Sequence, residues 1–348
     1  MRPGSLSGTA LDRRGVVVGL GAVAVALAIG ALGSGGLRWF DAALAGYLLG
    51  TLFAIFGTAY RYVVWLERPP TARLNRRGWQ AFRRGGLASF GRLVGLGATN
   101  LAGQTFIRRR SQARWLAHQL VFWGCVLAAA VTFPLVFGWL HFESVGQDDA
   151  RYRAFVGPFA TIAFDARGAF GWLVFHALDV ASVLVIAGVL IFLGRRVRDP
   201  GALAVERSTD FLALAGLFAV SVTGLMLTAS TLWMGGRFYT FLTTVHALTV
   251  ILGLMYIPFG KLFHVFQRPA NIGVHFYKEA GAAGAQQTCG ECGEPFASAL
   301  QIQDLKEVLP QVGFDYSLGG GRHYQDVCPP CRRRLVTLAQ SARVRGFA

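Results

Sequence analysis

The stretch FYTFLTTVHALTVILGLMYIPFGKLFH, residues 238–264, decides how the rest of this chain is interpreted. It is apolar over about 20 residues, which is long enough to cross a bilayer as a helix. His246 and His264 interrupt it, 18 residues apart. Eighteen steps of about 100° make five full turns, so one continuous helix would carry both imidazoles on one face, about 27 Å apart. We therefore expect one spanning helix with a histidine near each membrane surface.

The composition predicts a membrane protein with several spans. The chain has 348 residues, of which 53% are hydrophobic and 15% charged, and its mean hydropathy is +0.45. Its formal net charge is +16, carried mainly by arginine. In a membrane protein such an excess reports topology and contact with anionic lipids. No basic domain stands free of the apolar runs, so we expect membrane lipids, and not nucleic acid, as partners.

The apolar runs predict six transmembrane helices. The predicted spans are 16–34, 43–65, 115–140, 169–193, 210–234 and 238–263. The first run follows Arg13 and Arg14 without a small-residue cleavage site, so we expect a retained helix. Residues 67–114 hold eleven arginines and one glutamate, whereas loop 141–168 is near neutral. The positive-inside rule then predicts a multi-pass protein of the cell inner (plasma) membrane with both termini in the cytoplasm.

The predicted fold is an all-α membrane protein: a six-transmembrane-helix bundle with a small cytoplasmic, zinc-ribbon-like domain at its C-terminus. Its expected parts are 1–66 (two spans), 67–114 (a basic cytoplasmic segment), 115–280 (a four-helix domain) and 281–348 (a metal-binding tail). Within the basic segment, the run LASFGRLVGL at 87–96 has the composition of an interfacial helix. A solvated, lipid-facing linker and a docking surface for a partner are the alternatives for this segment.

Four histidines fall into two pairs of matching depth in this topology. His176 and His246 lie about 10 and 12 Å below the outer rim, and His118 and His264 lie at the cytoplasmic rim. Imidazole is a common axial ligand of haem iron, so the pairs predict two stacked haems. The alternative is that each histidine bonds a neighbouring carbonyl or water. His141, at the outer end of the third span, competes with His176 as the outer ligand.

Asp179 follows His176 by three residues and therefore shares its helix face. A carboxylate there would orient the ligand or accept a proton from a quinol. A carboxyl group bonded at the edge of the bundle is the alternative. His275 lies beyond the spans, and we expect it to be structural or solvated.

The run HALTVILGLMYIPFGKLFHVFQRP, residues 246–269, resembles the last haem-binding helix of the gamma subunit of membrane-bound respiratory nitrate reductase. It is also similar to cytochrome b subunits of heterodisulfide-reductase-like and sulfite-reduction-associated complexes. The resemblance covers about residues 112–280. It implies that these histidines ligate two b haems and that the subunit exchanges electrons with a quinone pool. The nitrate reductase subunit carries its other two ligands on a single helix, whereas His118 and His176 lie on consecutive spans, which points to the wider diheme class.

The tail carries two cysteine knuckles. CGEC at 289–292 and CPPC at 328–331 are separated by 35 residues. Such a pair predicts a four-thiolate site of Cys289, Cys292, Cys328 and Cys331 that binds zinc. A rubredoxin-like iron uses the same ligands, and four unmetallated thiols are the remaining alternative. We expect the tail to dock a cytoplasmic subunit.

Together these patterns predict the membrane-anchor subunit of a larger oxidoreductase. Electrons would pass between quinone or menaquinone and cytoplasmic iron–sulfur and catalytic subunits through two b haems. Two rival hypotheses remain. One is a proton-coupled transporter that uses His176, Asp179 and His246 as a relay. The other is a zinc-bearing membrane scaffold without redox function.

Overall fold

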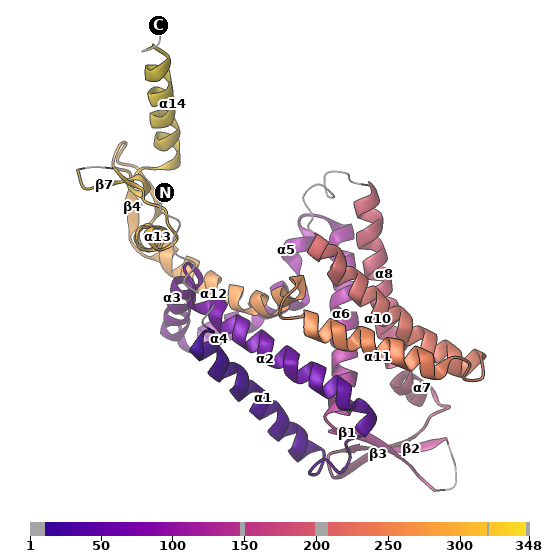
Figure 1. Cartoon of the computed structure of the whole chain (residues 1–348). Helices are drawn as coiled ribbons and strands as arrows, with labels where there is room; N and C mark the ends of the chain where they lie inside the picture. Colours follow the sequence, from indigo (N-terminus) through magenta and orange to yellow (C-terminus); the bar gives the residue numbers. More distant parts are fainter. Residues whose placement is uncertain (1–10, 147–149, 199–207, 319, 346–348) are drawn as a thin grey trace. The chain divides into compact units, whose positions relative to one another are not determined.

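The computed structural model describes residues 11–146, 150–198, 208–318 and 320–345, and Figure 1 shows the chain. Within these residues, six helices are long and apolar enough to cross a membrane, which confirms the predicted number of spans. They are α1 (Arg13–Gly33), α2 (Ala45–Glu67), α6 (Gln112–Val136), α8 (Ala177–Arg198), α10 (Ser208–Trp233) and α11 (Tyr239–Tyr256). Their length and composition indicate a multi-pass membrane protein.

The other helices are mostly short. They are η1 (Ala42–Leu44), α3 (Thr71–Arg84), α4 (Gly86–Gly97), the π-helical turn η2 (Ala98–Ala102), α5 (Thr105–Arg108), α7 (Ala169–Phe175), η3 (Lys261–Phe263), α12 (His264–Ala283), α13 (Ala299–Gln311), η4 (Tyr324–Asp326) and α14 (Pro329–Arg345). The strands are β1 (Leu140–Ser144), β2 (Arg151–Val156), β3 (Phe159–Asp165), β4 (Gln286–Thr288), β5 (Pro295–Ser298), β6 (Ser317–Leu318) and β7 (Arg322–His323).

The chain folds as two compact units that differ from the four expected parts. The first comprises residues 1–63 and 98–266, and the second comprises 64–97 and 267–348. The basic segment 67–114 is therefore divided, and its first part belongs with the tail. Tertiary contacts explain this division, because α3 contacts α12 and α13 of the second unit.

In the first unit, neighbouring helices approach closely at glycines. The pairs in contact are α1 with α2, α2 with α11, α11 with α10, α10 with α8, and α8 with α6. Glycines at three of these contacts are Gly15 and Gly19 (α1 against α2), Gly50 (α2 against α11), and Gly124 and Gly188 (α6 against α8). Between lipid-embedded helices, small residues are what allow close van der Waals packing.

The segment 141–168 is not a simple loop, so the all-α expectation is wrong here. Strands β1, β2 and β3 form an antiparallel sheet in that order, with Phe142 opposite Ala154. Gly157 has a φ of 56° between β2 and β3, where Val156 pairs with Phe159. A two-residue hairpin turn needs such a left-handed residue, and glycine takes it without strain.

The expected single helix over 238–263 is also wrong. α11 ends at Tyr256, and the chain turns through Pro258 and Gly260 before η3 and α12. Proline lacks the backbone N–H that a continuing helix needs. A guanidinium N–H of Arg61 donates to the Pro258 carbonyl, and the same side chain lies 4.3 Å from the centre of the Phe263 ring. His246 and His264 therefore do not share one helix face.

In the second unit, α3 crosses α12 where two glycines meet. A Cβ on Gly78 would lie 2.6 Å from the Gly273 carbonyl oxygen, so only glycine fits this crossing. Beside it, the rings of Phe82 and Phe276 meet edge to face with centroids 5.3 Å apart. The tail then forms the β4–β5 hairpin, α13 and α14 around a small core of Cys289, Val327 and Cys328.

Candidate metal centre and membrane histidines

The two cysteine knuckles meet, as the sequence predicts. Cys289 and Cys292 lie in the turn between β4 and β5, Cys328 precedes α14, and Cys331 lies in its first turn. All four Sγ atoms lie within 4.8 Å of one another, and those of Cys292 and Cys328 are 3.8 Å apart. A tetrahedral zinc with Zn–S bonds of about 2.3 Å has S···S edges of about 3.8 Å. These residues, the four-cysteine cluster, could therefore hold a metal ion.

Backbone N–H groups prepare the cluster for thiolates. Cys289 Sγ accepts from the N–H of Cys328 at 3.2 Å and from that of Glu291 at 3.4 Å. The Cys328 N–H is the main reason why the pKa of Cys289 is lowered to about 6. The neighbouring thiol of Cys328 is the main reason why the pKa of Cys331 is raised to about 12. Four adjacent thiolates need a cation between them, so this donor set fits a thiophilic metal.

The loop before Cys328 is held from two sides. Lys306 of α13 pairs with Asp326 at 2.6 Å. Arg332 of α14 donates to the Val327 carbonyl at 2.6 Å and stacks over the Tyr324 ring at 4.5 Å. The second knuckle is thereby fixed to both helices of the tail.

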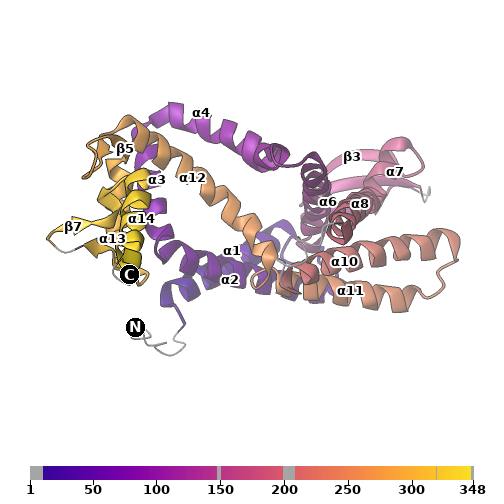
Figure 2. The ribbon, with the colours of Figure 1, turned by 90° about the horizontal axis from the view of Figure 1, so that it is seen from above.

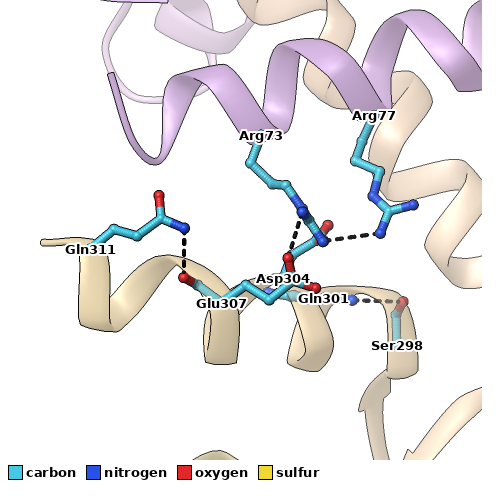
Figure 3. A network of polar contacts seen from close by, with 7 residues as sticks. All are labelled: Arg73, Arg77, Ser298, Gln301, Asp304, Glu307 and Gln311. Carbon is cyan, nitrogen blue, oxygen red and sulfur yellow. Dashed lines mark hydrogen bonds and ion pairs between the residues drawn. The ribbon is translucent and has the colours of Figure 1, made fainter. Parts of the chain in front are cut away.

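An ion cluster joins α3 to α13 (Figure 3). Arg73 contacts Asp304 at 2.6 Å and Glu307 at 2.5 Å, and Arg77 contacts Asp304 at 3.3 Å. The Asp304 side chain is only 6% exposed. Burial and the Asp304 charge raise the pKa of the nearby Tyr277 to about 12. This cluster was not predicted from the sequence. A signal was present, because Arg73 and Arg77, four residues apart, share one helix face, and Asp304 and Glu307, three residues apart, share another.

His246 is held by α10. Its Nδ1 lies 2.9 Å from Thr223 Oγ1, which itself donates to the Ala219 carbonyl at 2.7 Å. The hydroxyl oxygen therefore accepts from Nδ1–H, which leaves the lone pair on Nε2. A Cβ on Gly224 would lie 3.4 Å from His246 Cε1 and 3.8 Å from Ser182 Oγ, so the glycine keeps space beside the ring.

Two other candidate histidines share this arrangement. Nδ1 of His176 lies 3.0 Å from the Trp172 carbonyl, and Nδ1 of His264 lies 2.6 Å from the Lys261 carbonyl. A carbonyl can only accept, so Nδ1 carries the proton in both. His176 stands between α7 and α8, one residue before the span, because the predicted helix 169–193 is broken there. Its expected position seven residues inside the span is therefore wrong.

The rings of His118 and His141 lie against aromatic side chains. His118, in α6, packs edge to face on Phe192 of α8 at 4.9 Å. His141, in β1, is stacked between Trp39 and Phe155 at 4.9 and 5.0 Å, with its Nε2 3.8 Å from Glu143. That ring is occupied on both faces.

Asp179 joins two helices. In the first turn of α8, its Oδ1 accepts from Thr228 Oγ1 of α10 at 2.7 Å. The first turn of a helix favours a carboxylate through the helix dipole. This contact ties α8 to α10 near His176. His275 is exposed on α12, as expected.

Compared with known proteins, the chain matches no protein-family model, no curated protein and no solved structure.

Proposed function

We propose that this chain is the membrane-anchor cytochrome b subunit of a multi-subunit oxidoreductase. It carries electrons between the quinone or menaquinone pool and cytoplasmic iron–sulfur and catalytic subunits through two b haems. The proposed ligand pairs are His176 with His246 and His118 with His264. Bound haem supplies the one-electron chemistry, and the chain supplies the imidazoles and their orientation.

The observation that carries this proposal is the shared tautomer of three of the four histidines. In His176, His246 and His264, Nδ1 is bound to an oxygen acceptor, which leaves Nε2 as the nitrogen able to ligate. Metal-ligating histidines use their second nitrogen in this way, which fixes the ring and raises its basicity. Gly224 adds space beside the His246 ring where a side chain would compete with a ligand.

The other groups have supporting roles in the proposal. Asp179 lies three residues after His176 and accepts a hydrogen bond from Thr228. In the proposal its carboxylate orients the histidine ligand or takes a proton from quinol. The four-cysteine cluster holds zinc as a structural ion, and iron is the alternative. The metal-binding tail and the arginine run at 108–110 then dock the partner on the cytoplasmic side of the plasma membrane.

A pyridine-haemochrome assay on the purified full-length chain tests the central claim. We expect two b haems per polypeptide and low-spin spectra that change on reduction. Folded protein that contains no haem would overturn the proposal. Haem-free protein that moves protons across vesicles would instead favour the transporter hypothesis.

Single substitutions test the ligand pairs. His246→Ala and His176→Ala should each lose the same haem, whereas His118→Ala and His264→Ala should lose the other. Each should lower the haem content from two per chain to one.

His141→Ala and His275→Ala are the matched controls and should keep both haems. His141 lies between two rings and His275 lies in α12 outside the spans. Loss of a haem in His141→Ala, with both haems kept in His176→Ala, would show that the outer ligand is assigned to the wrong residue.

A further inference from the structure

An exposed face of α3 combines an aromatic ring with arginines. Trp79 is 55% exposed, and Arg76 and Arg83 are exposed three residues before it and four residues after it. This spacing places all three side chains on one face of the helix. Other sides of α3 are occupied, since Arg73 and Arg77 bind Asp304 and Gly78 meets the backbone of Gly273.

The next helix, α4, exposes an apolar stripe. Leu87, Phe90 and Val94 are 92%, 60% and 58% exposed, and their spacing of three and four residues places them on one face. Figure 2 shows α4 at the edge of the unit that it forms with α3, α12 and the tail. Its inner contacts lie elsewhere on the helix: Ser89 is buried, and Arg92 pairs with Glu279 of α12 at 2.7 Å.

The glycines of α4 indicate that this stripe needs a cover. Four of its twelve residues are glycine, and each costs about 1 kcal/mol relative to alanine in a helix. At Gly91 an added Cβ would meet nothing within 4 Å, so close packing does not require a glycine at this position. A helix with so low a propensity is stabilised mainly by burial of its apolar face.

We propose that α3 and α4 lie in the headgroup region of the membrane and bind anionic phospholipid. α3 begins at Thr71, directly after the spanning helix α2 ends at Glu67, so the bilayer surface is the nearest apolar phase. The sequence has no acidic residue between Glu67 and Glu143, whereas α3 and α4 carry six arginines. Three of these, Arg73, Arg77 and Arg92, pair with acidic side chains of α12 and α13, and Arg76 and Arg83 lie on the exposed face with Trp79. Exposed arginines beside tryptophan, with an adjacent apolar stripe, are typical of helices that lie in a membrane interface.

Binding of phospholipid at this face does not depend on haem. A protein partner would also cover an apolar stripe, but the exposed arginines beside Trp79 and the direct connection to a span favour phospholipid. The two occupants are distinguished by what a photoreactive side chain captures.

For the test, p-benzoylphenylalanine replaces Phe90 in the full-length chain. The protein is placed in nanodiscs of phosphatidylcholine and phosphatidylglycerol at a ratio of about 3:1, irradiated, and analysed by intact mass. The matched control carries the same group in place of Ala88, which is exposed about 160° away around the helix. We expect at least fivefold more lipid adduct at position 90 than at position 88.

The arginines are tested through lipid selectivity. The adduct at position 90 should be enriched in phosphatidylglycerol beyond its share of the bilayer. Arg76→Gln with Arg83→Gln should lower the ratio of phosphatidylglycerol to phosphatidylcholine among the adducts by about fivefold or more, since each basic residue near an anionic surface contributes about 1 kcal/mol. Equal lipid adducts at positions 88 and 90 would overturn the proposal. Capture of a polypeptide in native membranes, in place of lipid, would also overturn it.

Discussion

Asp304 is the residue whose loss should most weaken the connection between α3 and the C-terminal tail. Its carboxylate is bound by Arg73 and Arg77, and its side chain is only 6% exposed. Asp304→Asn keeps the size of the side chain and removes its charge. The two guanidinium groups would then face a neutral amide in a partly buried site.

The expected cost is about 3 kcal/mol, the lower end of the range for breaking a buried ion pair. The lower end applies because Arg73 and Arg77 are 18% and 29% exposed and keep some contact with water. If α3 and α13 separate more easily by that amount, their amides should exchange hydrogen about 100-fold faster. Glu307→Gln is the matched control, since Glu307 is 43% exposed and binds the same Arg73. Its cost should be at most about 1 kcal/mol, or about fivefold in exchange rate.

The assay is hydrogen exchange with mass spectrometry on the full-length protein. Peptides from α3 and α13 should lose protection in Asp304→Asn, while those from α6 and α8 should not change. Equal exchange in Asp304→Asn and Glu307→Gln would refute the argument that burial of Asp304 decides the strength of the contact.

Three further predictions concern the same unit. Gly78→Ala should weaken the crossing of α3 and α12 by about 1–3 kcal/mol, because the new Cβ meets the Gly273 backbone. Gly91→Ala, where the new Cβ enters open space, is the control and should not weaken it. Hydrogen exchange measures both variants. The pKa of Tyr277 is raised from 10.0 to about 12, so this group's contribution to stability is complete below about pH 10 and is lost between about pH 10 and 12. A titration followed by absorbance at 295 nm should show one fewer late-ionising tyrosine in Tyr277→Phe. Cys289→Ser with Cys328→Ser should lower bound zinc from one per chain to none by elemental analysis, with the helical content of the spans kept. One iron with a rubredoxin-like spectrum in the unmutated chain would contradict the zinc assignment.

The predictions from sequence that succeeded depend on local chemistry. A run of about 20 apolar residues can satisfy its backbone in a bilayer only as a helix, so the six spans follow from composition. The four-cysteine cluster follows from two CxxC pairs, because each pair fixes two thiols within one turn. The haem ligands and the electron-transfer role stay predictions that the proposed assays address.

The predictions that failed depended on extending one local pattern too far. Residues 257–263 remain largely apolar, but α11 ends at Tyr256, just before Pro258. Arg61, distant in sequence, donates a hydrogen bond to the Pro258 carbonyl. Likewise the near-neutral segment 141–168 pairs with itself as a sheet, because its strands satisfy one another's backbone.

By itself, therefore, the sequence determined the six candidate spans and the two CxxC pairs whose cysteines could hold a metal ion, since each span and each pair depends on residues close together in the chain. Only the tertiary structure decided where the basic segment belongs. Arg73 and Asp304 are 231 residues apart, and neither helix alone indicates the other as its partner. The carboxylate of Asp304 can be buried only when α3 supplies the guanidinium groups that neutralise it, and this joins residues 64–97 to the tail.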